Sequence, residues 1–135
     1  MLDLSALRTI FWLQSINDFS DNGKAEAAAV YEAMAPSVQR VRPQGLRILG
    51  ATIPSALGST RAGHGSELKD KRRQAFNAEV RKGALFDDIV DLDLALTDPL
   101  TGQLHAAFNA TAQLATRVTA YTLTVRDMLP WPVAL

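Results

Sequence analysis

Strand-like and helix-like stretches alternate along this chain, and that alternation restricts its fold more than any other feature. Short apolar runs at residues 7–14, 46–52 and 86–92 have the length and composition of buried strands. Between them lie two longer segments, 24–41 and 67–82, with apolar residues at helical spacing. Strands that alternate with helices form βαβ units, and the strands of such units are parallel. The sequence therefore predicts an α/β fold with a parallel sheet.

Polar residues, glycine and proline mark the ends of these elements. The loop Ser20–Gly23 contains residues that cap helices, and we expect it to begin the first helix. Pro36 lies inside that helix and should kink or split it, at a cost of about 3 kcal/mol. Gly83 suits the C-terminal cap of the second helix. The glycine-containing stretch 53–66 reads as a long loop, and long loops in compact domains are often functional.

Charged residues of the second half are expected to lie on solvated faces. The spacing in the predicted helix 67–82 places the basic run 69–73 on its outer face, where these side chains can pair with neighbouring acids. Four residues of the helix are expected to point inward: Leu68, Ala75, Phe76 and Val80. An acidic cluster follows, ending in a predicted turn at 98–102: Asp87, Asp88, Asp91, Asp93 and Asp98. Its spacing is not that of a calcium-binding loop, so we expect a solvated face and no metal site.

Composition limits the class of protein. A chain of 135 residues with 47% hydrophobic and 21% charged residues is expected to form one globular domain. Fourteen basic and fourteen acidic residues cancel, so we expect no nucleic-acid partner. The lack of cysteine excludes disulfides and cysteine-ligated zinc. The sequence contains no glycine-rich motif of the kind that binds nucleotides, and we expect no cofactor. We find neither a signal peptide nor an apolar stretch long enough for a membrane span, and we expect a cytoplasmic chain as given.

Asn17 is the first candidate for chemistry. It follows the apolar run 7–14, and ligands of open α/β sheets bind at the carboxyl ends of the strands. A side-chain amide there can donate a hydrogen bond to a developing oxyanion. Asn and Asp also favour turns and helix caps, and spacing alone favours that structural interpretation of Asn17 and Asp18.

Four stretches of the chain change this balance. The segment Phe11–Ser20 contains Ser-Ile-Asn-Asp, and a strand-like Ile48–Thr52 follows. Residues 71–81 read Lys-Arg-Arg-Gln-Ala-Phe-Asn-Ala-Glu-Val-Arg, and Phe-Asp-Asp-Ile-Val-Asp-Leu-Asp at 86–93 precedes an Asp-Pro pair. In this order the four stretches resemble conserved blocks of the SGNH (GDSL-type) hydrolases, which are esterases and acylhydrolases.

The resemblance implies a fold, a reaction and site residues. It implies a partial flavodoxin-like three-layer sandwich with a parallel sheet, in which residues 1–110 form an incomplete SGNH hydrolase-like domain. The implied function is that of a carboxylic ester hydrolase acting on a small ester substrate. Asn17 would be the oxyanion donor, and Asp18 and His64 would contact substrate. Neither a metal nor a cofactor is implied.

Departures from the family pattern predict that this chain is inactive alone. Ser15 stands where the family block has glycine, so a side chain occupies a turn that favours a bare backbone. The Gly-Asp-Ser block that supplies the family's nucleophile does not occur in the sequence. The family's base lies in an Asp-x-x-His motif, and neither His64 nor His105 has an aspartate three residues before it.

Residues 111–135 form an atypical, irregular tail. Read one base earlier, degenerate codons for 121–132 permit Leu-His-Pro-Asn, which resembles the family's final block. We therefore hypothesise that a frameshift replaced the catalytic Asp-x-x-His. The alternative is a genuine extra strand at 117–125, where threonine alternates with apolar residues.

A second function class stays open beside the ester hydrolase. A sheet that lacks its first strands exposes an edge and an apolar face. The chain would then be a non-enzymatic α/β binding module, or would associate with itself through the exposed sheet edge. A compact monomer in solution would count against this interpretation.

Overall fold

The computed structural model describes residues 8–60 and 63–108 and confirms the α/β class. Three parallel strands form a sheet in the order β1-β2-β3, with Phe11 opposite Leu49 and Leu49 opposite Asp88. In chain order the elements are β1 (Thr9–Trp12), α1 (Ala27–Val41), η1 (Arg42–Gln44), β2 (Arg47–Ala51), α2 (Glu67–Arg81), β3 (Asp88–Val90), α3 (Leu92–Leu96) and η2 (Ala106–Phe108).

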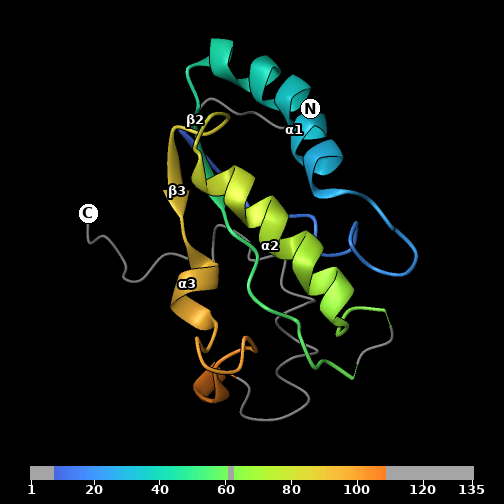
Figure 1. The fold of residues 1–135 in the computed structure, drawn as a ribbon. Helices are drawn as coiled ribbons and strands as arrows, with labels where there is room; N and C mark the ends of the chain where they lie inside the picture. The colour runs from blue at the N-terminus through green and yellow to red at the C-terminus, as the bar shows by residue number, and fades with distance from the viewer. Residues whose placement is uncertain (1–7, 61–62, 109–135) are drawn as a thin grey trace.

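Both long helices pack on one face of the sheet (Figure 1). The Tyr31 ring of α1 lies 6.3 Å from the Phe76 ring of α2, centroid to centroid, and both helices bury residues against Ile48 of β2. The described residues thus form a helix layer and a sheet layer. The second layer of long helices that a three-layer sandwich requires is not seen among them.

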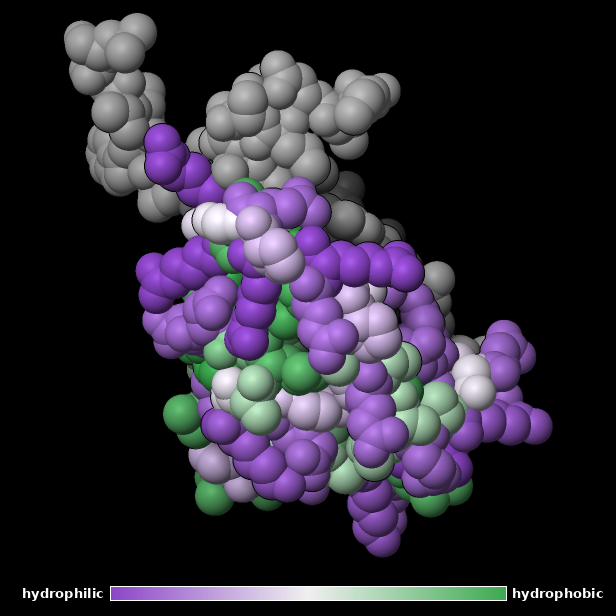
Figure 2. Space-filling model, turned by 90° about the horizontal axis from the view of Figure 1, so that it is seen from above, coloured by the Kyte–Doolittle hydropathy of each residue, from purple (hydrophilic) through white to green (hydrophobic). Residues whose placement is uncertain are grey.

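The core lies between these two layers. Its buried apolar residues come from the turn after β1, both helices, β2 and the chain after it: Phe19, Ala27, Met34, Val38, Ile48, Ile53, Phe76, Val80 and Phe86. Seen from above, hydrophobic residues also show near the centre of a mostly polar face (Figure 2). Leu94 and Leu100 are largely exposed as well. The described elements therefore do not enclose all of their apolar side chains.

The first helix, α1, differs from the sequence-based expectation in where it begins and in the effect of Pro36. It begins at Ala27 and not at residue 24, and no side chain caps its N-terminus. The expectation that the loop Ser20–Gly23 caps this helix was wrong, because Ser20 Oγ donates to the Asn17 carbonyl instead. Pro36 lies inside α1, yet the helix continues to Val41 without splitting. Burial of Met34 and Val38 on either side of the proline stabilises the helix there.

The second helix has its expected bounds but not its expected inner face. Gly83 ends it with φ of 70°, as the sequence predicts. Phe76 and Val80 are buried, whereas Leu68 is 61% exposed and Ala75 is exposed, so these two assignments were wrong. Polar residues take their place inside: Asp70, Arg73 and Asn77.

The remaining predictions concern strand ends, loops and the tail. β1 and β3 are shorter than expected, and α3 begins where the third strand was predicted to continue. The predicted turn at 98–102 is confirmed by a hydrogen bond from Gly102 N–H to the Asp98 carbonyl. The hypotheses on residues 111–135 lie outside the described residues. Among those described, no helix has both the length and the hydrophobicity to span a bilayer.

Candidate functional site

A tight turn follows β1 and carries Asn17 and Asp18. The Asp18 N–H donates to the Ser15 carbonyl at 3.0 Å, and the Asn17 carbonyl accepts from Ser20 Oγ at 2.6 Å. Gly23 closes this turn, since a Cβ there would collide with the backbone oxygen of Asp18. The turn lies at the carboxyl end of β1, where the sequence predicts it.

Asn17 points its functional group toward solvent. The residue is exposed, and its side-chain amide makes no hydrogen bond to any described residue. An exposed amide donor is available to a bound carbonyl. The role of Asn17 as an oxyanion donor stays a prediction.

Ser15 adopts a backbone conformation that favours glycine. Its φ is 101°, and the residue is buried. This position is the one at which the resembling family block has glycine. The expected strain at the turn is therefore present, and a side chain at this φ costs of the order of 1 kcal/mol or more.

Replacing Ser15 by glycine should stabilise the protein. We expect Ser15→Gly to raise the free energy of unfolding by about 1 kcal/mol, because glycine adopts positive φ without a Cβ clash. Urea unfolding followed by circular dichroism measures the change. Ser15→Ala is the control, since it removes the hydroxyl but keeps the Cβ, and it should give no gain. Equal stabilisation by both variants would locate the cost in the hydroxyl and not in the backbone.

The two predicted substrate contacts lie at different cavities. Asp18 lines a groove of about 460 Å³, the α1 groove, together with residues of β1, the turn and α1: Trp12, Gln14, Ser15, Ala25, Ala29, Val30, Ala33, Met34 and Ser37. His64 lines a much smaller cavity of about 10 Å³ beside Phe19 and Arg73. The structure thus does not bring Asp18 and His64 to one pocket, and Asn17 lines neither of these two cavities.

The loop that carries His64 is held against the turn after β1. The Asp21 N–H donates to the Gly63 carbonyl at 3.3 Å. Lys69 of α2 forms an ion pair with Asp21 at 2.5 Å, and this hydrogen bond is the main reason that the pKa of Asp21 lies below its usual value. The predicted long loop therefore approaches the turn through backbone and charge contacts.

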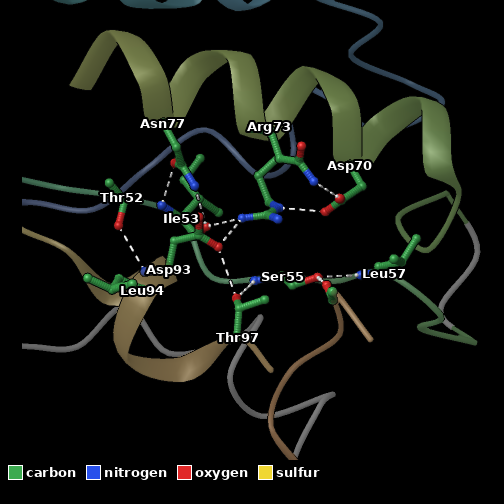
Figure 3. Close-up of polar contacts among 12 residues, drawn as sticks. Thr52, Ile53, Ser55, Leu57, Asp70, Arg73, Asn77, Asp93, Leu94 and Thr97 are labelled. Atoms are coloured by element: carbon green, nitrogen blue, oxygen red, sulfur yellow. Dashed lines mark hydrogen bonds and ion pairs between the residues drawn. The ribbon is translucent and has the colours of Figure 1, made fainter. Parts of the chain in front are cut away.

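The most developed polar cluster lies beneath α2, and no sequence pattern described above predicts it (Figure 3). Arg73 is only 3% exposed, and it donates to Asp70 at 2.7 Å, to Asp93 at 2.5 Å and to the Ile53 carbonyl at 2.8 Å. Asn77, one turn further along α2, accepts from Ile53 N–H at 2.8 Å and donates to its carbonyl at 2.9 Å. These two side chains fix the backbone of Ile53, where the chain leaves β2.

This cluster continues to the beginning of α3. Thr52 Oγ1 donates to Asp91 at 2.8 Å and accepts from Asp93 N–H at 2.9 Å, while Thr97 Oγ1 donates to Asp93 at 2.9 Å. Arg81 contacts both carboxylates from α2. The expectation of a solvated face was therefore wrong for Asp91 and Asp93, because arginines of the preceding helix reach over them.

Arginine contacts make these two aspartates stronger acids. The hydrogen bond from Arg81 lowers the pKa of Asp91 to about 2, against desolvation that would raise it. Burial raises the pKa of Asp93, but the hydrogen bonds and charges of Arg81 and Arg73 outweigh it, so that the net shift is downward. Asp91 and Asp93 therefore take part in the cluster as ionised carboxylates.

Acid should weaken this part of the fold. The folded pKa of Asp91 lies below its unfolded value of 3.8, so the stabilisation is complete above about pH 4 and is lost as the pH falls toward 2. We expect a loss of about 1 kcal/mol in that window, since the Arg81 pair is partly exposed to solvent. Unfolding free energies of wild type and Asp91→Asn, measured from pH 6 to 2, should converge at the acid end. Asp88→Asn is the control, because its pair with Arg47 is mostly exposed. A constant difference between wild type and Asp91→Asn over this range would contradict the assignment.

The described residues offer few groups for a metal or cofactor. No three His, Asp or Glu side chains among them are grouped so that they could hold a metal ion. Two buried polar atoms of the described part, Trp12 Nε1 and Tyr31 OH, have no hydrogen-bond partner. Trp12 belongs to the lining of the α1 groove, and a bound acceptor there would satisfy its indole N–H.

Comparison with known proteins adds no assignment. Neither the scan against protein-family models nor the search of curated proteins finds a match to this chain.

Proposed function

We propose that residues 1–110 are the scaffold of an SGNH-type carboxylic ester hydrolase with a flavodoxin-like sheet. The observation that carries the proposal is the positive φ of Ser15, 101°, at the position where the resembling block has glycine. The sequence pattern and the backbone conformation agree at this residue. The parallel order of β1, β2 and β3, with the turn at a carboxyl strand end, is compatible with such a sheet.

The helix motif supports the same proposal. The stretch that resembles the family's Lys-Arg-x-x-x-Asn helix is α2, and its asparagine is Asn77. Asn77 is completely buried and makes two hydrogen bonds with Ile53, while Arg73 adds a third at the same carbonyl. Two polar residues of this stretch thus bind the chain where it leaves β2.

Ester hydrolysis on this scaffold requires groups that the sequence does not contain in the family's motifs. A serine hydroxyl would attack the ester carbonyl carbon, a histidine would take its proton, and the alcohol would leave before water releases the acid. Asn17 would donate to the oxyanion formed in both steps. We therefore expect no serine-dependent turnover from this chain alone.

The coding DNA and an activity assay together test the proposal. In the shifted frame, the codons for residues 121–132 should read through a His-Pro-Asn sequence with an Asp three places before the His. A chain that restores this frame, extended upstream by a Gly-Asp-Ser block, should hydrolyse a short-chain nitrophenyl ester. Its Asn17→Ala variant should lose on the order of 100-fold in rate. Absence of those codons would refute the frameshift, and turnover by the present chain that Asn17→Ala abolishes would refute its predicted inactivity.

A further inference from the structure

β1 lies at one border of the described sheet. It pairs with β2, and no described strand pairs with its other edge. An unpaired strand edge presents a row of free N–H and C=O groups that another strand can bind. This observation does not depend on ester chemistry.

The hydrogen-bond pattern identifies the groups on that free edge. The Arg47 N–H donates to the Arg8 carbonyl at 3.0 Å, with Thr9 opposite Arg47. Successive residues of a strand direct their backbone groups to alternate sides, so Ile10 and Trp12 also face β2. Thr9 and Phe11 therefore direct their N–H and C=O groups away from the described sheet.

The residues of β1 include none of the types that prevent edge-to-edge pairing. β1 reads Thr-Ile-Phe-Trp and contains neither proline nor lysine. Beside it, α1 presents the exposed alanines Ala29 and Ala33 along the α1 groove. Small side chains at this position allow the backbone of a neighbouring element to approach closely.

Charges at the two ends of β1 indicate which partner fits. Arg8 precedes the strand and Asp18 follows it, and neither forms an ion pair with a described residue. An antiparallel copy of the same strand brings the positive end of one chain to the negative end of the other. The net charge of zero removes long-range repulsion between copies.

We infer that a second copy of this chain docks on β1 through a two-fold axis, so that two β1 strands pair antiparallel and join two sheets into one. The outward groups of Thr9 and Phe11 form the ladder, and the alanine faces of the two α1 helices lie beside it. This register sets Arg8 of each copy opposite Trp12 of the other, at the strand end that leads into the turn with Asp18.

Analytical ultracentrifugation of the full chain tests this interface. We expect a dimer, and we expect Thr9→Pro to weaken it at least about tenfold, because proline removes an outward donor while Ile10 and Trp12 keep the ladder to β2. Ala33→Glu in the α1 groove should weaken it similarly. Ala28→Glu is the matched control, since Ala28 is exposed on the same helix but does not line the groove.

A charge exchange tests the orientation. Arg8→Asp and Asp18→Arg should each weaken the dimer, and the double variant should restore it, while circular dichroism confirms that each variant is folded. Failure of the double variant to restore the dimer would overturn the antiparallel arrangement. A full chain that stays monomeric at about 1 mM would overturn the interface itself. So would a chain that dimerises only after removal of residues 109–135, because its own tail would then be the occupant.

Discussion

Arg73→Met should destabilise the protein by about 3–5 kcal/mol, because it leaves carboxylates buried without their main counter-charge. The Asp70 and Asp93 side chains that Arg73 joins are 7% and 13% exposed. Methionine fills a similar volume but donates no hydrogen bond to either, nor to the Ile53 carbonyl. Urea unfolding at neutral pH gives the change directly.

The neighbouring arginine supplies a matched control for this prediction. Arg72 pairs with Glu26 at 2.9 Å, but the Glu26 side chain is 72% exposed. Arg72→Met should therefore cost no more than about 1 kcal/mol. Arg73→Lys should recover part of the loss, since it keeps a charge but cannot reach several acceptors at once. Similar costs for Arg72→Met and Arg73→Met would show that burial of the Arg73 pair contributes little.

Periodicity predicts the backbone of this protein better than it predicts the inner face of α2. The bounds of α2 follow from its apolar spacing and from Gly83, and β2 follows from a run of apolar residues. The same spacing assigned Leu68 to the core and Arg73 to solvent, and both assignments were wrong. Hydrophobicity alone cannot identify a buried arginine, because its burial depends on Asp93, which is distant in sequence.

The candidate site was predicted at the level of position and not of geometry. The turn after β1 was expected from local sequence, and the strain at Ser15 was expected from the resemblance, whose block has glycine at this position. The relation between Asp18 and His64 depends on how the stretch 53–66 folds back, which no local pattern records. The spacing of Arg73 and Asn77, four residues apart in a helix, was the one signal that could have revealed the buried cluster.

Asn77→Leu should cost about 2–3 kcal/mol, since it leaves the buried Ile53 N–H without an acceptor. Asn77 is completely buried, and leucine has a similar size, so little of the loss should come from packing. Gln39→Leu, at an exposed position of α1, should change stability by less than about 0.5 kcal/mol. Hydrogen exchange should show faster exchange of the Ile53 amide in Asn77→Leu than in wild type.

A double-mutant cycle shows whether Arg73 and Asn77 act on Ile53 as one unit. Both side chains donate to the Ile53 carbonyl, at 2.8 and 2.9 Å, so that when one donor is removed the carbonyl keeps the other as its partner. Removing both leaves that carbonyl unsatisfied, and the combined loss should differ from the sum of the single losses by about 1 kcal/mol. Additive losses would mean that each side chain stabilises a separate part of the fold. A coupled loss, with faster amide exchange through residues 53–60, would show that α2 holds the loop leaving β2 through this single peptide group.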